Sequence, residues 1–201
     1  MKKGLLGCLV LAAGLVVLAL VLGMWVAAQY NGLVNAQEKV KAAWSQVENV
    51  YQRRYDLIPN LVETVKGVAS FEKETYTAVT EARAKVGQIR LSADVLENPQ
   101  AFHRLEAAQG ELSSTLSRLF AVAENYPDLK ANKNFLELQS QLEGTENRIA
   151  VERRRFNETA QAYNIRLRSF PTNSVAALFG FKERPYFEAA AGAATAPKVK
   201  F

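Results

Sequence analysis

Few side chains in this chain of 201 residues are suited to catalysis. It has one histidine, His103, and one cysteine, Cys8, and it contains no Gly-rich phosphate loop, His-Glu-x-x-His pair or nucleophile elbow. Helical bundles can hold di-iron centres through Glu-x-x-His pairs, and the nearest spacing here is Glu143 with Glu146. We interpret that pair as solvated charges and His103 as an exposed surface residue. The sequence therefore predicts a protein that is not an enzyme and that uses no metal or cofactor.

A polar stretch within an apolar repeat is a candidate binding site. Between Phe135 and Phe170, large apolar residues recur every seven positions. The positions three residues after them should share the same helix face, but they include the polar residues Thr145, Glu152 and Thr159. In one interpretation these residues form an internal polar layer in which Glu152 pairs with a cation from a facing helix, because an unpaired buried carboxylate is too costly. In the other, which we favour, Ala160 and Leu167 occupy the core and the polar residues lie at its edge.

The charged residues indicate a solvated helical surface. The sequence has 25 Lys and Arg against 20 Asp and Glu, a formal net charge of +5, and its cations alternate with Glu. No nucleic-acid partner is predicted from this pattern. The Arg53-Arg54 pair lies roughly 37 Å along a straight helix from the apolar N-terminal stretch, several Debye lengths at physiological salt, which is too far to bind headgroups there. We expect Arg153-Arg154-Arg155 to form salt bridges with Glu152 and Glu158.

The chain begins with a cationic segment, residues 1–4, followed by an uncharged apolar stretch, residues 5–28. As a helix this stretch is roughly 36 Å long, enough to cross a hydrocarbon core of about 30 Å. We therefore predict a transmembrane helix with cations at one end, leucines in the lipid and aromatic residues at the far interface. The residues assigned to this anchor are Lys2, Lys3, Leu5, Leu15, Leu22, Trp25 and Tyr30.

The charges flanking the span favour one orientation. Lys2, Lys3 and the amino terminus lie directly against it, whereas the next cations, Lys39 and Lys41, lie farther away beside Glu38. This asymmetry places the N-terminus in the cytoplasm. Leu5-Leu6-Gly7-Cys8 resembles a lipoprotein box, but such a box follows its apolar region, and here the apolar region follows the cysteine.

Residues 30–171 have the pattern of an up-and-down four-helix bundle, so the fold class is all-α. The first helix is expected to continue from the span to about Leu57 and the second to begin at Asn60, after a turn at Pro59. A competing observation is that Trp44, Tyr51, Ile58 and Val65 stay in phase at seven residues, as in one kinked helix. We favour the turn because it gives helices of matching length.

The third and fourth helices have clearer boundaries. Asn98 and Pro99 have the types expected of an N-cap and a first helical residue, and Pro127 is expected to end that helix. Asn132 or Asn134 should cap the fourth helix, which ends at Pro171. One apolar stripe per helix and short connections are best buried in a bundle.

The C-terminal part is divided into an amphipathic segment, residues 172–188, and a flexible tail, residues 189–201. The segment contains Phe179 and Phe181 and is expected to form a short helix across one end of the bundle, with a membrane surface or a partner as the alternative. The tail ends at Phe201 and is expected to be inert or to fold back, although peptide-binding grooves capture such termini. Phe179, Phe181 and Phe201 are the candidate partner contacts.

Several long segments in order resemble the LemA family over essentially the whole chain. They are YNGLV (30–34), RRYDLIPNLVETVKG (53–67), TEARAK (80–85), ENYPDLKANKNFLELQ (124–139), EGTENRIAVERRRFN (143–157), FGFKERPYF (179–187) and PKVKF (197–201). The resemblance implies a bacterial, membrane-anchored helical bundle and supports the turn at Pro59. It implies no reaction, because that family has no established one. Relatives associated with magnetosomes suggest a role in membrane organisation, and family members are discussed alongside membrane proteases.

These observations together predict a non-enzymatic scaffold or adaptor of the bacterial cell envelope. It would cross the inner (cytoplasmic) membrane once, with its C-terminal domain periplasmic or extracellular. The expected partners are the lipid bilayer, other envelope proteins including membrane proteases, and further copies of the chain. The alternative is a bundle that binds a ligand or lipid through the internal polar layer of Thr145, Glu152 and Thr159.

Overall fold

A computed structural model of the chain describes residues 2–68, 71–89 and 93–188. The described residues form helices and loops without a β-strand, which confirms the all-α prediction. The elements are α1 (Lys2–Lys66), α2 (Lys73–Gly87), the 3-10 helix η1 (Ala93–Glu97), α3 (Pro99–Ala123), α4 (Pro127–Lys130), α5 (Lys133–Arg168) and α6 (Thr172–Leu178).

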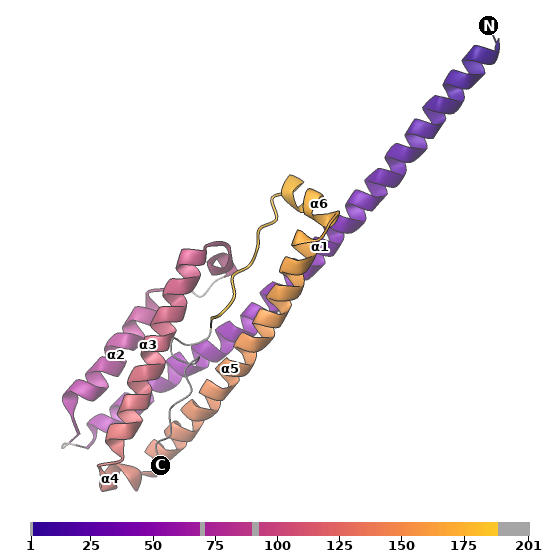
Figure 1. Cartoon of the computed structure of the whole chain (residues 1–201). Coiled ribbons are helices and arrows are strands. Elements are labelled where there is room, and N and C mark those ends of the chain that lie inside the picture. Colours follow the sequence, from indigo (N-terminus) through magenta and orange to yellow (C-terminus); the bar gives the residue numbers. More distant parts are fainter. Residues whose placement is uncertain (1, 69–70, 90–92, 189–201) are drawn as a thin grey trace, which may run out of the picture.

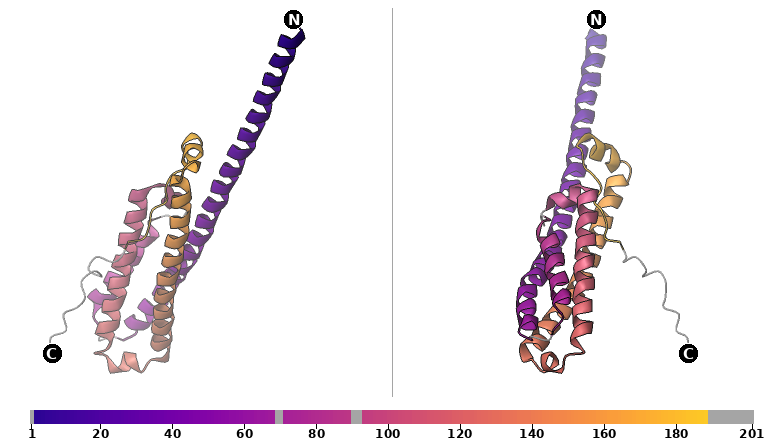
Figure 2. Two further views of the ribbon diagram at one scale, coloured as in Figure 1. Left: turned by 45° about the vertical axis from the view of Figure 1, so that its right-hand side comes forward. Right: turned by 90° about the vertical axis from the view of Figure 1, so that its left-hand side faces the viewer.

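The second half of α1 packs with α2, α3 and α5 as a bundle in which each long helix runs opposite to the one before it (Figure 1). The most extensive packing joins α1 with α5 and α2 with α3. This arrangement confirms the predicted up-and-down four-helix bundle. The N-terminal half of α1 projects alone from one end, where α6 also lies, and α4 lies at the opposite end (Figures 1 and 2).

The projecting part of α1 has an apolar surface that none of the other described elements covers. Leu11, Leu15 and Leu22 are 71%, 67% and 53% exposed. An 18-residue window of this helix has a mean hydropathy of 2.5, and none of that window is buried. A helix of this length and composition partitions into lipid. The chain is therefore membrane-associated through this part of α1.

Helix α1 is continuous from Lys2 to Lys66, so the predicted turn at Pro59 is wrong. The first helix does not end near Leu57, and no new helix begins at Asn60. The helix persists because its apolar positions stay in phase across the proline: Ile58 and Val65 are fully buried. The chain turns instead after Lys66, at Gly67.

The missing N–H of Pro59 is compensated by another helix. In a regular helix that N–H would bond to the carbonyl of Tyr55, four residues earlier. Here Arg83 of α2 donates from Nε to the Tyr55 carbonyl oxygen at 3.0 Å, and its guanidinium lies 3.7 Å from the centre of the Tyr55 ring. The proline is therefore tolerated because tertiary packing supplies the partner that the backbone lacks.

The other helix boundaries agree more closely with expectation. The Asn98 side chain accepts bonds from the N–H groups of Gln100 and Ala101, with Pro99 as the first helical residue. Asn132, and not Asn134, caps α5 in the same way. Helix α3 ends at Ala123, four residues before Pro127, and Pro127 begins the single-turn helix α4.

The bundle core consists of two apolar clusters along its length. The cluster nearer the membrane includes Trp44, Tyr51 and Phe156, and the other includes Ile58, Leu61 and Phe135. After α6 and a turn at Phe179 and Gly180, the chain returns along the bundle as an extended segment, residues 181–188, which we call the strap (Figure 2). The strap adds Phe187 to the first cluster.

The compensation of Pro59 by Arg83 predicts a coupled effect on stability. Arg83→Met should lower the free energy of unfolding by about 1–2 kcal/mol, because the Tyr55 carbonyl loses a charged donor. In a Pro59→Ala background the loss should be smaller, because the alanine introduced there supplies a backbone N–H to the same carbonyl. Urea unfolding of the full chain in detergent, followed by circular dichroism, measures this cycle.

Lys85→Met is the matched control, since Lys85 is an exposed cation on the same helix that pairs with Glu111. It should change the free energy of unfolding by less than about 0.5 kcal/mol in both backgrounds. Equal losses for Arg83→Met with and without Pro59 would contradict the compensation.

Candidate binding site

A buried arginine lies between the two apolar clusters. The side chain of Arg54 is 1% exposed. Its Nη1 donates to Ser113 Oγ at 2.7 Å and to Glu146 Oε2 at 2.6 Å, and its Nη2 donates to the Gln109 carbonyl at 3.4 Å and to Gln109 Oε1. We call Arg54, Gln109, Ser113 and Glu146 the Arg54 cluster. It ties α1 to α3 and α5 at one level of the bundle.

The predicted polar layer of Thr145, Glu152 and Thr159 does not meet at an internal site. Thr145 is buried, but its hydroxyl donates to Gln141 O at 2.7 Å, and Thr159 donates to Arg155 O at 2.8 Å. Glu152 pairs with Arg155 of its own helix at 2.8 Å, as expected, whereas Arg153 pairs with Glu106 of α3 and not with Glu152 or Glu158. The favoured interpretation agrees with the packing at Ala160, which is fully buried, and at Leu167, which packs against the core. It is wrong for Thr145, which is 1% exposed and lies in the core, not at its edge.

Sequence reasoning missed Arg54 although a signal for it was present. The buried core residues of this part of α1 are spaced three or four residues apart, at Val47, Tyr51, Ile58 and Leu61. Arg54 lies between Tyr51 and Ile58 at the position that continues this spacing. A cation at a core position requires partners on facing helices. Glu146, interpreted as a solvated charge, is one of them and is 48% exposed.

Two asparagines of α5 hold the strap against the bundle. Asn157 donates to the Phe187 carbonyl and accepts from the Phe187 N–H, each at 2.9 Å. Asn164 is fully buried; it donates to the Arg184 carbonyl at 2.8 Å and accepts from the Arg184 N–H at 2.9 Å. Each side-chain amide thus pairs with both polar groups of one strap residue, as a neighbouring backbone does in a β-ladder.

Aromatic packing and a cation–π contact complete the strap's attachment. The Phe187 ring lies 4.7 Å from Phe102, 5.5 Å from Phe156 and 6.1 Å from Trp44, measured between ring centres. Arg153 lies over the same ring, 4.4 Å from its centre, and pairs with Glu106 at 2.6 Å. The strap is therefore an extended peptide that the bundle binds through apolar, amide and charged contacts at once.

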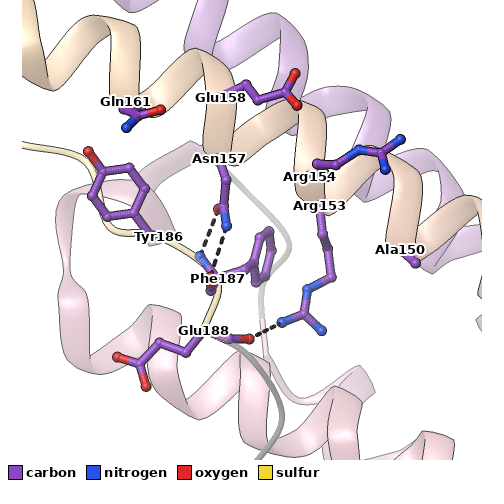
Figure 3. Close-up of a pocket in the computed structure, with 9 residues that line it drawn as sticks. All are labelled: Ala150, Arg153, Arg154, Asn157, Glu158, Gln161, Tyr186, Phe187 and Glu188. Atoms are coloured by element: carbon purple, nitrogen blue, oxygen red, sulfur yellow. Dashed lines mark hydrogen bonds between the residues drawn. The ribbon is translucent and has the colours of Figure 1, made fainter. Parts of the chain in front are cut away.

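A surface groove of about 630 Å³ runs beside the strap on α5 (Figure 3). Arginine, glutamate and amide side chains line one wall, and aromatic residues of the strap line the other. The lining residues are Ala150, Arg153, Arg154, Asn157, Glu158, Gln161, Tyr186, Phe187 and Glu188. This mixture suits the binding of an extended polypeptide with carboxylates. The described side chains contain no group of three or more His, Cys, Asp or Glu that could hold a metal ion.

The predicted partner contacts lie at the membrane-proximal end. The rings of Phe179 and Phe181 pack edge-on against Tyr30, with 4.9 and 5.6 Å between ring centres. Phe201 and the rest of the predicted tail, residues 189–201, lie outside the described residues. His103 is 56% exposed, as predicted.

The predicted anchor residues all lie in α1. Leu15 and Leu22 are uncovered, and Trp25 and Tyr30 are 37% and 38% exposed. The side chains of Lys2, Lys3 and Leu5 lie outside the described part of the chain. The lipid contacts assigned to these residues stay predictions.

Burial changes the acidity of two tyrosines. It raises the pKa of Tyr51 to about 12, against the partly opposing charges of Arg153 and Arg54. It also raises the pKa of Tyr163. The two hydroxyls differ in hydrogen bonding: Tyr163 donates to the Lys182 carbonyl at 3.0 Å, whereas Tyr51 Oη has no partner among the described residues.

Comparison with known proteins reveals a family. The model of the LemA family matches residues 43–201. The magnetosome protein MamQ 2 of Paramagnetospirillum magneticum is 29% identical over 176 residues, which cover 80% of this chain and 65% of that protein. MamQ of Magnetospirillum gryphiswaldense is 29% identical over 175 residues, covering 79% and 64%. Protein LemA of Metamycoplasma hominis is 27% identical over 146 residues, covering 73% and 63%. The chain thus spans slightly less than two thirds of the length of these relatives.

The contrast between the two tyrosines predicts opposite mutational effects. At neutral pH, Tyr51→Phe should raise the free energy of unfolding by about 1 kcal/mol, because it removes a buried hydroxyl without a partner. Tyr163→Phe should lower it by about 1 kcal/mol, because the Lys182 carbonyl loses its donor. Thermal unfolding of both variants in detergent distinguishes them, and an effect of the same sign would contradict the assignment.

The raised pKa of Tyr51 also predicts a pH dependence. A folded-state pKa of about 12 against an ordinary value of 10.0 means that the folded state holds this proton more tightly. The stability contributed by the proton is complete below pH 10 and is lost as the pH rises from 10 toward 12. The advantage of Tyr51→Phe over the wild type should therefore grow over this interval in unfolding measurements. A constant difference would contradict the pKa shift.

The contacts in the Arg54 cluster predict that substituting Arg54 alone destabilises the protein more than substituting Arg54 and Gln109 together. Arg54→Met should cost about 1–3 kcal/mol of unfolding free energy, because it leaves the buried Gln109 side chain unpaired. Adding Gln109→Leu should restore part of the loss, because apolar groups then replace both partners. Urea unfolding compares the two variants, and a double variant less stable than Arg54→Met would contradict this account.

Proposed function

The chain belongs to the LemA family, and on that premise we propose that it is a membrane-anchored, non-enzymatic scaffold or adaptor of the bacterial cell envelope. In this proposal the N-terminus is cytoplasmic, α1 crosses the inner membrane, and the bundle lies on the periplasmic or extracellular side. The groove beside the strap binds an extended segment of another envelope protein or of a second copy of the chain. The magnetosome relatives support a role in organising membrane-bound assemblies.

The observation that carries this proposal is the continuity of α1. One helix of 65 residues, about 98 Å long, includes both the apolar projecting part and the first helix of the bundle. A flexible linker between anchor and domain would let the bundle tumble near the membrane. A continuous helix instead gives every bundle surface a defined height above the bilayer, which is a property useful to a protein that positions partners.

The groove is the surface best suited to a partner. Asn157 and Asn164 already bind one extended peptide, the strap, through its backbone. Arg154 and Glu158 are exposed on α5 at the edge of the groove, where they offer charges of both signs (Figure 3). Charges at such a rim contribute to partner selection and to the rate of association.

The ligand-binding alternative is supported less well. It requires Thr145, Glu152 and Thr159 to face an internal site. Their polar atoms are used instead by α5 itself, in bonds to Gln141 O, Arg155 and Arg155 O respectively.

In-cell photocrosslinking tests the scaffold function. A photoreactive amino acid placed at Gln161, in the groove, should form an adduct with another envelope protein or a second copy, identified by mass spectrometry. Arg154→Glu should lower the adduct yield about tenfold, as expected for a loss of about 1.4 kcal/mol at a charged rim.

The matched control is the same amino acid at Arg118, an exposed position on α3 away from the groove. Equal adducts from both positions, or a yield unaffected by Arg154→Glu, would count against a specific site in the groove.

A further inference from the structure

Three large apolar side chains are exposed around the short helix α6. Phe170, just before it, is 85% exposed, and Leu178 and Phe179, at its other end, are 76% and 50% exposed. Single exposed apolar residues are ordinary on protein surfaces. Here three of them flank one seven-residue helix at one end of the molecule. We call Phe170, Leu178 and Phe179 the membrane-proximal surface.

The packing of α6 places this surface at the end of the membrane span. Thr172 at the start of α6 donates from its hydroxyl to Gln29 Oε1 at 3.0 Å, and the Phe179 ring packs against Tyr30. Gln29 and Tyr30 directly follow the uncharged stretch, residues 5–28. One helical turn is about 5.4 Å, so α6 lies within about one turn of the last apolar residue of the span. The figures show α6 beside the point where α1 leaves the bundle (Figures 1 and 2).

Cations surround the same end of the bundle. The Arg166 guanidinium occupies the space that a Cβ on Gly32 would take, so that side chain lies flat against α1. Arg168 and Lys182 are exposed nearby in sequence, and Arg168 lies 3.6 Å from Glu183. Apolar residues next to cations are the combination that binds the interfacial region of a bilayer, because the apolar groups insert and the cations meet phosphates.

We propose that the membrane-proximal surface inserts into the interfacial region of the same bilayer that α1 crosses. The bundle then has two attachments to lipid, the span and α6. A single helix leaves the domain free to rotate about the helix axis, whereas a second attachment beside it fixes the rotation. This inference rests on the membrane anchoring in the proposed function and adds the face of the bundle that meets the lipid.

Site-directed spin labelling of the full chain tests this contact. In a Cys8→Ala background, which removes the only native thiol, single cysteines replace Phe170, Leu178 or Phe179 and carry a nitroxide. The protein is placed in nanodiscs of phosphatidylcholine and phosphatidylglycerol, at one copy per disc. Relaxation by oxygen, which partitions into lipid, is compared with relaxation by a water-soluble nickel complex.

Leu136→Cys is the matched control, because Leu136 is also an exposed apolar residue, 49% exposed, and lies near the start of α5 at the far end of the bundle. The ratio of oxygen to nickel accessibility should be several-fold higher at Phe170→Cys and Leu178→Cys than at Leu136→Cys. Because Leu178 is largely uncovered, its variant keeps the test valid even if Phe179→Cys weakens the contact with Tyr30.

Equal ratios at all these positions would overturn the proposal. A surface that is water-accessible in single-copy discs but protected when several copies share a disc would also overturn it, because the occupant would then be a second copy. The Gln161 crosslink, measured in the same cysteine variants, reports separately on the groove. Its loss with intact lipid contact would count against the scaffold function and not against the lipid contact.

Discussion

The arrangement of the molecule depends on the continuity of α1 through Pro59. A proline inside a helix removes one hydrogen bond and typically costs about 3 kcal/mol, so the uninterrupted helix needs support from elsewhere. Arg83 provides it through its bond to the Tyr55 carbonyl and its stacking on the Tyr55 ring. Because α2 carries Arg83, the bundle stabilises the helix that in turn anchors the bundle. The continuity of the helix and the packing of the bundle are thus one cooperative property.

Polar contacts then define how the other elements sit on α1. A purely apolar bundle tolerates small shifts of one helix along another, because apolar contacts have little directionality. The guanidinium of Arg54 has fixed donor directions, and its acceptors lie on two other helices, at Ser113 and Glu146. The amides of Asn157 and Asn164 act in the same way on the strap. These few directional groups select one register from several that the apolar residues alone would allow.

The structural features that were predicted correctly depend on residues close together in the chain. The features that were missed depend on contacts between residues far apart in the chain. The span, the caps at Asn98 and Asn132 and the bundle class follow from local composition, periodicity and capping. The continuity of the helix through Pro59 depends on Arg83, and the burial of Arg54 depends on Glu146, 92 residues away. The strap shows no periodic pattern of apolar residues from which its position could be predicted. It is an extended segment that its hydrogen bonds to α5 hold in place. In each case the missing information was a tertiary partner, although the phase of Ile58 and the core position of Arg54 pointed toward it.

The groove lies farther from the membrane-proximal end of α5 than the distance over which the charge of lipid headgroups acts strongly. Gln161 lies seven residues before the end of α5 at Arg168, and Ala150 lies eighteen residues before it. At about 1.5 Å per residue, the groove extends from roughly 10 to 27 Å from the membrane-proximal end of that helix. This exceeds the Debye length of about 8 Å at physiological salt, so lipid headgroups compete weakly for Arg154. In the proposed function, a partner anchored in the same bilayer would have to raise an acidic, extended segment to this height in order to bind the groove. Under this proposal, partners would be selected by the height of their binding segment, because the anchor and the bundle share one helix.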